Sequence, residues 1–171
     1  MYNGNIAETY WRTKTDNVLR KYGYAYDGLN RLTNAIYQKP NASVPVTNSY
    51  NESLSYDKNG NIASLFRTGD SDVDFASIGA QTIDNLAYVY DTQNPNQLMK
   101  VTDSSMMSKG FRDDTLTDAG DVQEDYAYDE MGNMIADQNK RILGITYNHL
   151  NLPVEIPVSY THLRAHETKA N

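Results

Sequence analysis

Aromatic residues in several segments of this chain recur at every second position, and long apolar stripes at helical spacing are missing. Three tyrosine pairs show the pattern: Tyr24 and Tyr26, Tyr88 and Tyr90, and Tyr126 and Tyr128. In a pleated strand, side chains two residues apart lie on the same face of the sheet. Clusters of Asn, Asp and Gly separate these segments, as they commonly separate strands. The pattern predicts a predominantly β protein.

A short frame of residues is repeated along the chain, which is typical of proteins built from structural repeats. The letters NGNIA stand at 3–7 and again at 59–63, and GNMIA follows at 132–136. The longer copies read YAYDGLNRLTNA, YDKNGNIASL, YVYDTQNPNQLMKV, YDEMGNMIAD and ITYNHLNLPVEI. Measured from the Asp of each copy, or from Asn148 in the last, they are 30, 34, 38 and 19 residues apart. The repeated unit is therefore short, and the segments between units vary in length.

Each copy is predicted to form the corner of a β-hairpin. The Asp begins the turn, because its short carboxylate can accept hydrogen bonds from the N–H groups just ahead of it. Gly60 and Gly132 supply the positive φ that a reversing chain needs. An apolar residue begins the return strand five positions after the Asp or Asn in four copies, and after seven in the third. The predicted turn residues are Tyr26, Asp27, Tyr56, Asp57, Gly60, Tyr90, Asp91, Tyr128, Asp129, Gly132, Tyr147 and Asn148.

Composition adds that the core is rich in tyrosine. Only 39% of the 171 residues are hydrophobic, and 14 residues are Tyr. Tyrosine brings both apolar area and a hydroxyl, so Tyr-faced strands need polar partners for the ring tips. The Arg, Asp and Asn residues of the turns are the expected partners.

Charge and residue usage narrow the possible partners. The net charge is −7 and no Lys/Arg cluster is present, which argues against binding nucleic acid. There are no cysteines, so disulfides and thiolate chemistry are excluded. No cofactor is expected. No stretch approaches the roughly 18 apolar residues of a membrane span, and the first residues lack a signal-peptide pattern.

These frames resemble the YD repeats of the Rhs family of bacterial surface and secreted proteins, which is related to Tc-toxin C components and teneurins. The most specific segments are YGYAYDGLNRLTNA, IDNLAYVYD with NQLMKVTD, and ITYNHLNLPVEI. The resemblance covers residues 1–156 and implies a spiral sheet of stacked antiparallel hairpins that can close into a shell around a toxic segment. It also implies a location at the cell surface or outside the cell.

The resemblance is incomplete at both ends. No segment resembles the Rhs core motif that closes such a shell, and no toxin domain is recognisable. We therefore expect residues 1–156 to be a fragment of a repeat region whose partners are the remaining repeats, the core domain and the toxin of a parent chain. Functions that depend on cleavage or cargo are not carried over to this chain.

Residues 157–171 are expected to be a separate tail, either helical or disordered. His162 and His166 have the i, i+4 spacing of zinc ligands on a helix, but no third ligand accompanies them. The letters SYTHLRAHET also resemble a translated sequencing adapter, so we interpret the tail as an artefact and expect no metal site.

Other candidate sites have simpler explanations. Asp70, Asp72 and Asp74 have a spacing seen in calcium loops but lack the accompanying Gly and Glu, so we interpret them, like the acidic segment 111–121, as solvated loop. His149 has no nucleophile motif beside it. Asn41 and Asn51 fit glycosylation patterns, which we read as a sign of exposed loop within a long connection at 38–53.

Two functions remain, and both are non-enzymatic. The first is a structural part of an Rhs/YD-repeat shell associated with toxin encapsulation or delivery. The alternative is an adhesin-like module that binds carbohydrate on its exposed tyrosines, because aromatic rings stack on sugar faces. An enzyme is the least favoured class, because no catalytic constellation emerges from the sequence.

Overall fold

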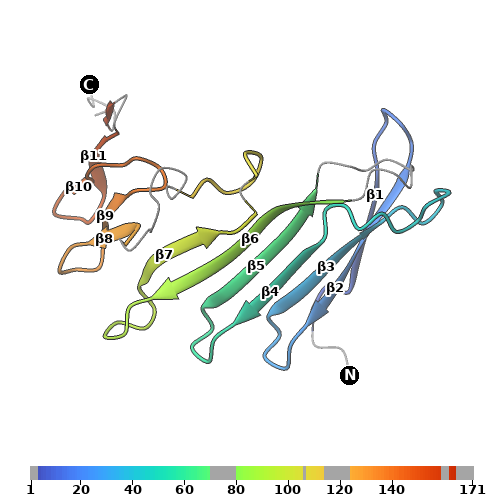
Figure 1. Cartoon of the computed structure of the whole chain (residues 1–171), viewed down its shortest axis with the longest axis horizontal. Coiled ribbons are helices and arrows are strands. Elements are labelled where there is room, and N and C mark those ends of the chain that lie inside the picture. Colours follow the sequence, from blue (N-terminus) through green and yellow to red (C-terminus); the bar gives the residue numbers. More distant parts are fainter. Residues whose placement is uncertain (1–3, 70–79, 106, 114–123, 159–161, 165–171) are drawn as a thin grey trace. The chain divides into compact units, whose positions relative to one another are not determined.

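The computed structural model describes residues 4–69, 80–105, 107–113, 124–158 and, as backbone alone, 162–164. All regular structure in these residues is β-strand, which confirms the predicted all-β class (Figure 1). The chain divides into two units, 1–87 with 103–111, and 88–102 with 112–171. Each unit is described separately.

The described strands alternate with the predicted turns. Their bounds are β1 Glu8–Arg12, β2 Leu19–Tyr26, β3 Leu32–Gln38, β4 Glu52–Tyr56, β5 Ile62–Gly69, β6 Gln81–Tyr90, β7 Leu98–Asp103, β8 Tyr126–Tyr128, β9 Met134–Asp137, β10 Thr146–Tyr147, β11 Pro153–Pro157 and β12 His162–Arg164. The order within the largest sheet follows the chain from β1 to β7, and two smaller sheets contain β8–β9 and β10–β12. Every strand pair with a described register is antiparallel.

In the first unit, two repeat turns lie at the same end of the strands, in the β2–β3 and β4–β5 hairpins (Figure 1). The connection between these hairpins lies at the opposite end of the strands, between the end of β3 at Gln38 and the start of β4 at Glu52 (Figure 1). This position agrees with the long connection predicted at 38–53.

The two faces of this sheet differ in burial. On one face, Tyr22 lies opposite Tyr37 and Leu65 lies opposite Leu86. Tyr37 and Leu86 are among the few buried apolar residues of the described chain. The other face carries exposed residues such as the Ser55–Ser64 pair. The strands therefore show the one-sided burial that their period-two pattern predicts.

The second unit contains short hairpins of the same kind. The β8–β9 and β10–β11 pairs each enclose a repeat turn. Strand β12 pairs with β11, with Ile156 opposite Leu163. The expectation of a helical or disordered tail is therefore wrong for 162–164, because the free edge of β11 pairs with this segment. Residues 165–171, and with them His166, lie outside the described residues, as do Asp70, Asp72, Asp74 and residues 114–123 of the second acidic segment.

Candidate functional site: the tyrosine–aspartate corners

The repeated residues form turns that we call corners 1 to 5, at 27–31, 57–61, 91–97, 129–133 and 148–152. Positions are counted from the Asp or Asn that begins each corner. The strand before a corner is its outgoing strand and the strand after it is its return strand.

Corner 2 shows the basic geometry. The backbone N–H of Asp57 donates to the carbonyl of Asn61 at 2.9 Å, and Gly60 N–H donates to the Asp57 carbonyl at 3.2 Å. One carboxylate oxygen, Oδ1, accepts the N–H groups of Asn59 at 2.8 Å and Asn61 at 2.9 Å. The other, Oδ2, accepts the Asn61 side chain at 2.9 Å. The aspartate thus binds the turn that follows it at positions +2 and +4.

Corners 1, 4 and 5 repeat this arrangement. In corner 4, Asp129 accepts the N–H groups of Met131 and Asn133 and the side chain of Asn133. In corner 1, the +4 side chain is Arg31, which forms an ion pair with Asp27 at 2.7 Å. Corner 5 begins with Asn148, whose Oδ1 accepts the N–H groups at +2 and +4 without any carboxylate charge.

Position +3 has a left-handed backbone in all four corners. Gly60 and Gly132 have φ of 94° and 83°, while Asn30 and Asn151 have φ of 62° and 57°. An L-residue other than Asn or Asp is strained in this region. The Gly and Asn letters of the repeat therefore mark a backbone requirement.

Corner 3 is built differently because it is two residues longer. The N–H of Asp91 donates to the Gln97 carbonyl at 2.8 Å, and the Asp91 carboxylate accepts the N–H groups of Gln93 and Asn94. No residue of 91–97, all of them described, has a positive φ. The aspartate keeps its role, and the longer loop removes the need for a left-handed residue.

At corners 1, 2, 4 and 5, the tyrosine before the corner joins its repeat to the repeat before it. Its hydroxyl donates to a backbone carbonyl at or just before the start of the preceding return strand, which is position +5 in corners 1 and 4. The described bonds are Tyr26 to Ile6 at 2.9 Å, Tyr56 to Leu32 at 2.7 Å, Tyr128 to Leu98 at 2.7 Å and Tyr147 to Met134 at 2.6 Å. In corner 3, Leu98 is this first return-strand residue, at +7. We call these contacts tyrosine staples.

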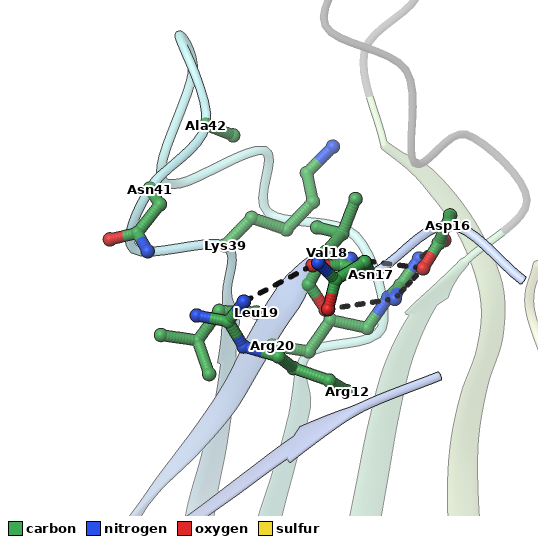
Figure 2. Close-up of a pocket in the computed structure, with 9 residues that line it drawn as sticks. All are labelled: Arg12, Asp16, Asn17, Val18, Leu19, Arg20, Lys39, Asn41 and Ala42. Atoms are coloured by element: carbon green, nitrogen blue, oxygen red, sulfur yellow. Dashed lines mark hydrogen bonds and ion pairs between the residues drawn. The ribbon is translucent and has the colours of Figure 1, made fainter. Parts of the chain in front are cut away.

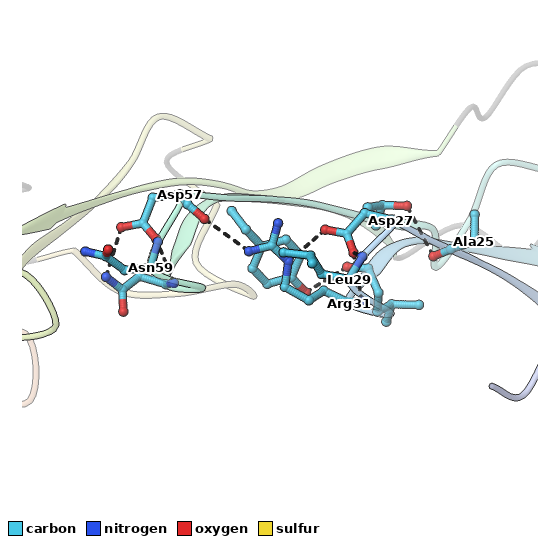
Figure 3. Close-up of polar contacts among 10 residues, drawn as sticks. Ala25, Asp27, Leu29, Arg31, Asp57 and Asn59 are labelled. Carbon is cyan, nitrogen blue, oxygen red and sulfur yellow. Dashed lines mark hydrogen bonds and ion pairs between the residues drawn. The ribbon is translucent and has the colours of Figure 1, made fainter. Parts of the chain in front are cut away.

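Side chains at +3 and +4 add further contacts between neighbouring corners. The Arg31 guanidinium donates to the backbone carbonyl of Asp57 at 3.0 Å and lies 4.6 Å from the centroid of the Tyr56 ring. Figure 3 shows Arg31 between Asp27 and Asp57. In the second unit, Asn133 donates to Asn151 at 3.3 Å. In both pairs of corners, the side chain at position +4 of one corner therefore donates to the next corner.

These bonds favour the ionised form of the corner carboxylates. The Arg31 backbone N–H and then its guanidinium lower the pKa of Asp27. The Asn133 side chain is the main group that lowers the pKa of Asp129. Desolvation raises the pKa of Asp57, but the hydrogen bonds from Asn61, Asn59 and Gly60 outweigh it and the net pKa is lowered. These three corners are therefore built for charged carboxylates.

A second set of polar contacts lies at the far ends of the strands, and sequence analysis did not identify it. Three repeats share such a contact. A return-strand residue ten positions after the Asp of its corner bonds to an Asp or Asn side chain, and this Asp or Asn lies before the corner of the next repeat. The contacts are Tyr37 N–H to Asn51 Oδ1 at 2.9 Å, Arg67 Nε to Asp84 Oδ2 at 2.6 Å and Val101 N–H to Asp125 Oδ2 at 2.7 Å. These acceptors stand at different distances before their corners, so no fixed spacing could reveal them.

Asp84 is the most enclosed of these acceptors. It is 0% exposed, pairs with Arg67 and also accepts the backbone N–H of Phe111. The loop approaches closely at Gly110, where an added Cβ would overlap the Ile83 carbonyl and the Asp84 carboxylate. Asn51, which we expected to mark exposed loop, is half-buried with its side chain engaged, while Asn41 is exposed.

A cleft of about 550 Å³ lies beside the β1–β2 turn, lined by residues that include Arg12, Arg20, Asp16 and Lys39 (Figure 2). Hydrogen bonds from Arg20, then from Thr13 and the Val18 N–H, lower the pKa of Asp16. The Asp16 carboxylate forms an ion pair with Arg20. The cleft therefore presents basic groups and a carboxylate that is already paired with Arg20.

An aromatic cluster occupies the buried face of the first unit. Tyr22 stacks on Trp11 at 5.6 Å and on Tyr24 at 5.9 Å between ring centroids, and meets Tyr37 edge-on at 5.7 Å. The Tyr22 hydroxyl donates to the Tyr50 carbonyl. Much of the surface of these rings is therefore in contact with the neighbouring rings.

Among the described residues, no group of three His, Asp or Glu side chains is placed to hold a metal ion. The described part of the chain also contains no apolar helix of membrane-spanning length. No protein-family model and no curated protein sequence matches this chain. Function is therefore inferred from the geometry of the corners.

Proposed function

We propose that the chain is a structural, non-enzymatic segment of an Rhs/YD-repeat surface or secreted protein, whose hairpins build part of a shell used in toxin encapsulation or delivery. One observation carries this proposal. The tyrosine and aspartate that define the repeat are used in bonds within and between repeats. Side chains that are bonded within the fold in this way have a structural role.

The contacts between repeats also favour extension of the sheet. Each return strand pairs with the outgoing strand of the next repeat in the same register. Asn34 lies opposite Ser53, and Ser64 lies opposite Ala87. In both pairs, position +7 of one repeat lies opposite position −4 of the next. A further repeat can therefore be added without changing the contacts of its neighbours. This is the property of repeat proteins in which each unit contacts only the next.

Duplication of one repeat tests the proposal. A second copy of residues 19–51 would be inserted between Asn51 and Glu52, so that the added outgoing strand meets β3 as β4 now does. We expect a folded protein with the same circular dichroism per residue and an equal or higher melting temperature. Loss of the folded β signal after insertion would contradict a modular scaffold.

Carbohydrate binding is the second candidate, and the aromatic cluster is the observation that favours it. Trp11 and Tyr24 lie at the two ends of the stack on Tyr22, so each has one ring face turned away from Tyr22. Sugars stack on such faces. A glycan-array screen decides between the candidates: binding that Trp11→Ala abolishes would favour the adhesin, and no binding to any glycan would favour the scaffold.

A further inference from the structure

Two neighbouring corners each contain an Asp or Asn that is followed directly by glycine. The pairs are Asp27–Gly28 in corner 1 and Asn59–Gly60 in corner 2. A further pair, Asn3–Gly4, has Asn3 outside the described residues. In such a pair, the backbone nitrogen of the glycine can attack the side-chain carbonyl carbon of the residue before it and close a five-membered imide. Glycine favours this closure because it has no Cβ and restricts the backbone least. Whether a pair reacts then depends on how its corner uses the side chain.

In corner 1 the side chain is held in the turn. Asp27 Oδ1 accepts the N–H groups of Leu29 at 2.9 Å and Arg31 at 3.0 Å, and Oδ2 pairs with the Arg31 guanidinium at 2.7 Å. The Arg31 N–H and then its guanidinium lower the pKa of the Asp27 carboxyl, which is therefore ionised at neutral pH. A bonded carboxylate resists attack by a nitrogen, because its carbon already bears a negative group. Corner 1 therefore protects the Asp27–Gly28 pair.

In corner 2 the Asn59 side chain takes no part in the turn. Asn59 stands at position +2, where its backbone N–H donates to the Asp57 carboxylate (Figure 3). Its side chain is exposed and forms no hydrogen bond within the described part of the chain. Leu29, Met131 and Leu150 stand at the same position in corners 1, 4 and 5. The turn therefore does not require an amide at +2, and the amide of Asn59 is available to react.

The nitrogen that would attack this amide is held by one long hydrogen bond. Gly60 N–H donates to the Asp57 carbonyl at 3.2 Å, whereas the equivalent bonds of corners 1, 4 and 5 are 3.0 Å long. No atom lies within 4 Å of the Cβ that would be added at Gly60. Short exposed turns of this kind open locally without unfolding of the whole protein. Opening of corner 2 therefore releases the Gly60 nitrogen next to a reactive amide.

We infer that Asn59–Gly60 is a site of spontaneous covalent modification, at which the asparagine becomes aspartate or isoaspartate. The Gly60 nitrogen forms a bond to Asn59 Cγ, the Cγ–Nδ2 bond breaks, and the amide nitrogen leaves as ammonia with the proton lost from Gly60. Water then opens the imide at one of its two carbonyl carbons. Opening at Cγ gives aspartate, and opening at the backbone carbonyl carbon gives isoaspartate. Water is the only co-reactant, and the inference does not depend on the proposed scaffold function.

The isoaspartate form would disrupt corner 2. Its backbone passes through the former side chain, so a methylene group is added between positions +2 and +3. The N–H groups of Gly60 and Asn61 can then no longer both bond to Asp57 as they do in the unmodified corner. The new carboxylate also adds a negative charge close to Asp57, in a chain whose net charge is already −7. The modification is therefore a slow, one-way loosening of the β4–β5 hairpin.

Peptide mapping of the full chain tests the inference. The folded protein is incubated at neutral pH and digested at intervals. Mass spectrometry then follows the replacement of NH2 by OH at Asn59, and backbone fragmentation distinguishes isoaspartate from aspartate. We expect progressive conversion of Asn59, while Asp27 remains ordinary aspartate in the same samples. Because the readout is assigned to single peptides, reaction at Asn3 does not interfere.

Three variants test the contribution of the corner. Met131→Asn places the same pair in corner 4, where Gly132 has a φ of 83°, close to the 94° of Gly60, and we expect conversion at position 131 as well. Asn59→Leu should remove the reaction and keep the fold, because Leu29 occupies this position in corner 1. Gly60→Asn keeps the left-handed turn but places a Cβ beside the nitrogen, and should slow conversion of Asn59 at least about tenfold. Circular dichroism checks that each variant is folded.

The separated isoaspartate form should lose protection from amide hydrogen exchange in corner 2 and retain it in corner 4. An intact Asn59 in the folded chain would overturn the inference, whether or not the same chain reacts in urea, because the closed corner would then protect the pair. Equal isomerisation at Asp27, or an isoaspartate form with a fully protected corner 2, would also overturn it. None of these results alters the outcome expected for repeat duplication, so the two proposals fail separately.

Discussion

The two ends of each hairpin are stabilised in different ways. At the corner end, the same residues recur and make the same bonds, as in corners 2 and 4. At the far end, the connections differ in length, and the acceptor is Asn51 in one repeat and Asp84 in another. A repeated sequence therefore records where the backbone must repeat its conformation, while contacts that depend only on proximity can be made by residues at varying positions.

The largest effect is expected at the far end, at Asp84. Asp84→Ala would remove a fully buried carboxylate that accepts hydrogen bonds from the Arg67 guanidinium and the Phe111 N–H. We expect a loss of about 3 kcal/mol in the free energy of unfolding, measured by urea denaturation. Asp84→Asn keeps an acceptor and should cost less. Equal stability of the wild type and Asp84→Ala would contradict this account of the far end.

The left-handed turn position should come next. Gly60→Val is expected to cost about 1–2 kcal/mol, because the φ of 94° is strained for a β-branched residue. No atom lies within 4 Å of the Cβ that would be added, so the cost comes from the backbone alone. Gly60→Asn is the matched control, because Asn30 and Asn151 occupy the same position, and we expect less than about 0.5 kcal/mol. Similar melting temperatures for the two variants would exclude a backbone requirement.

A tyrosine staple should contribute less than the turn. Tyr56→Phe removes the hydroxyl that bonds to the Leu32 carbonyl and should cost about 1 kcal/mol. Tyr10→Phe is the control, because the Tyr10 hydroxyl donates to the exposed Glu8 carboxylate of its own strand. If both variants unfold at the same urea concentration, the staple adds nothing between repeats.

The smallest effect is a dependence of stability on pH. The lowered pKa values of Asp27, Asp57 and Asp129 mean that folding favours their ionised forms. Their contribution is fully present above the unfolded pKa of about 4 and is lost as pH falls through the folded pKa values. The melting temperature should therefore decrease when the pH is lowered below about 4. Asp57→Asn should reduce this fall, because corner 5 shows that Asn148 holds the turn without a charge.

The sequence was sufficient to predict the corners but not the contacts between repeats. Asp57 and Gly60 are informative because turns restrict both the side chain that can accept nearby N–H groups and the backbone φ. The staple from Tyr56 to Leu32 and the ion pair of Arg67 with Asp84 depend on strand register. Register becomes definite only when strands pair, so a single sequence does not reveal which carbonyl a tyrosine will meet.

The longer corner 3 and the tail show the same limit. The repeat indicated a turn at Asp91, but the loop of 91–97 closes without a left-handed residue. His162 and His166 have the spacing of zinc ligands on a helix, yet residues 162–164 pair with β11. Local spacing could not predict this, because the pairing depends on a neighbouring strand edge.

Amide hydrogen exchange within the corners tests the central claim most directly. In corner 2, the N–H groups of Asn59, Gly60 and Asn61 are bonded to Asp57, whereas the N–H of Lys58 donates no hydrogen bond within the described part of the chain. The account predicts slow exchange at +2, +3 and +4 and fast exchange at +1, with the same alternation in corners 1, 4 and 5. Uniformly fast exchange across these turns would contradict the claim that the repeated aspartate organises each corner.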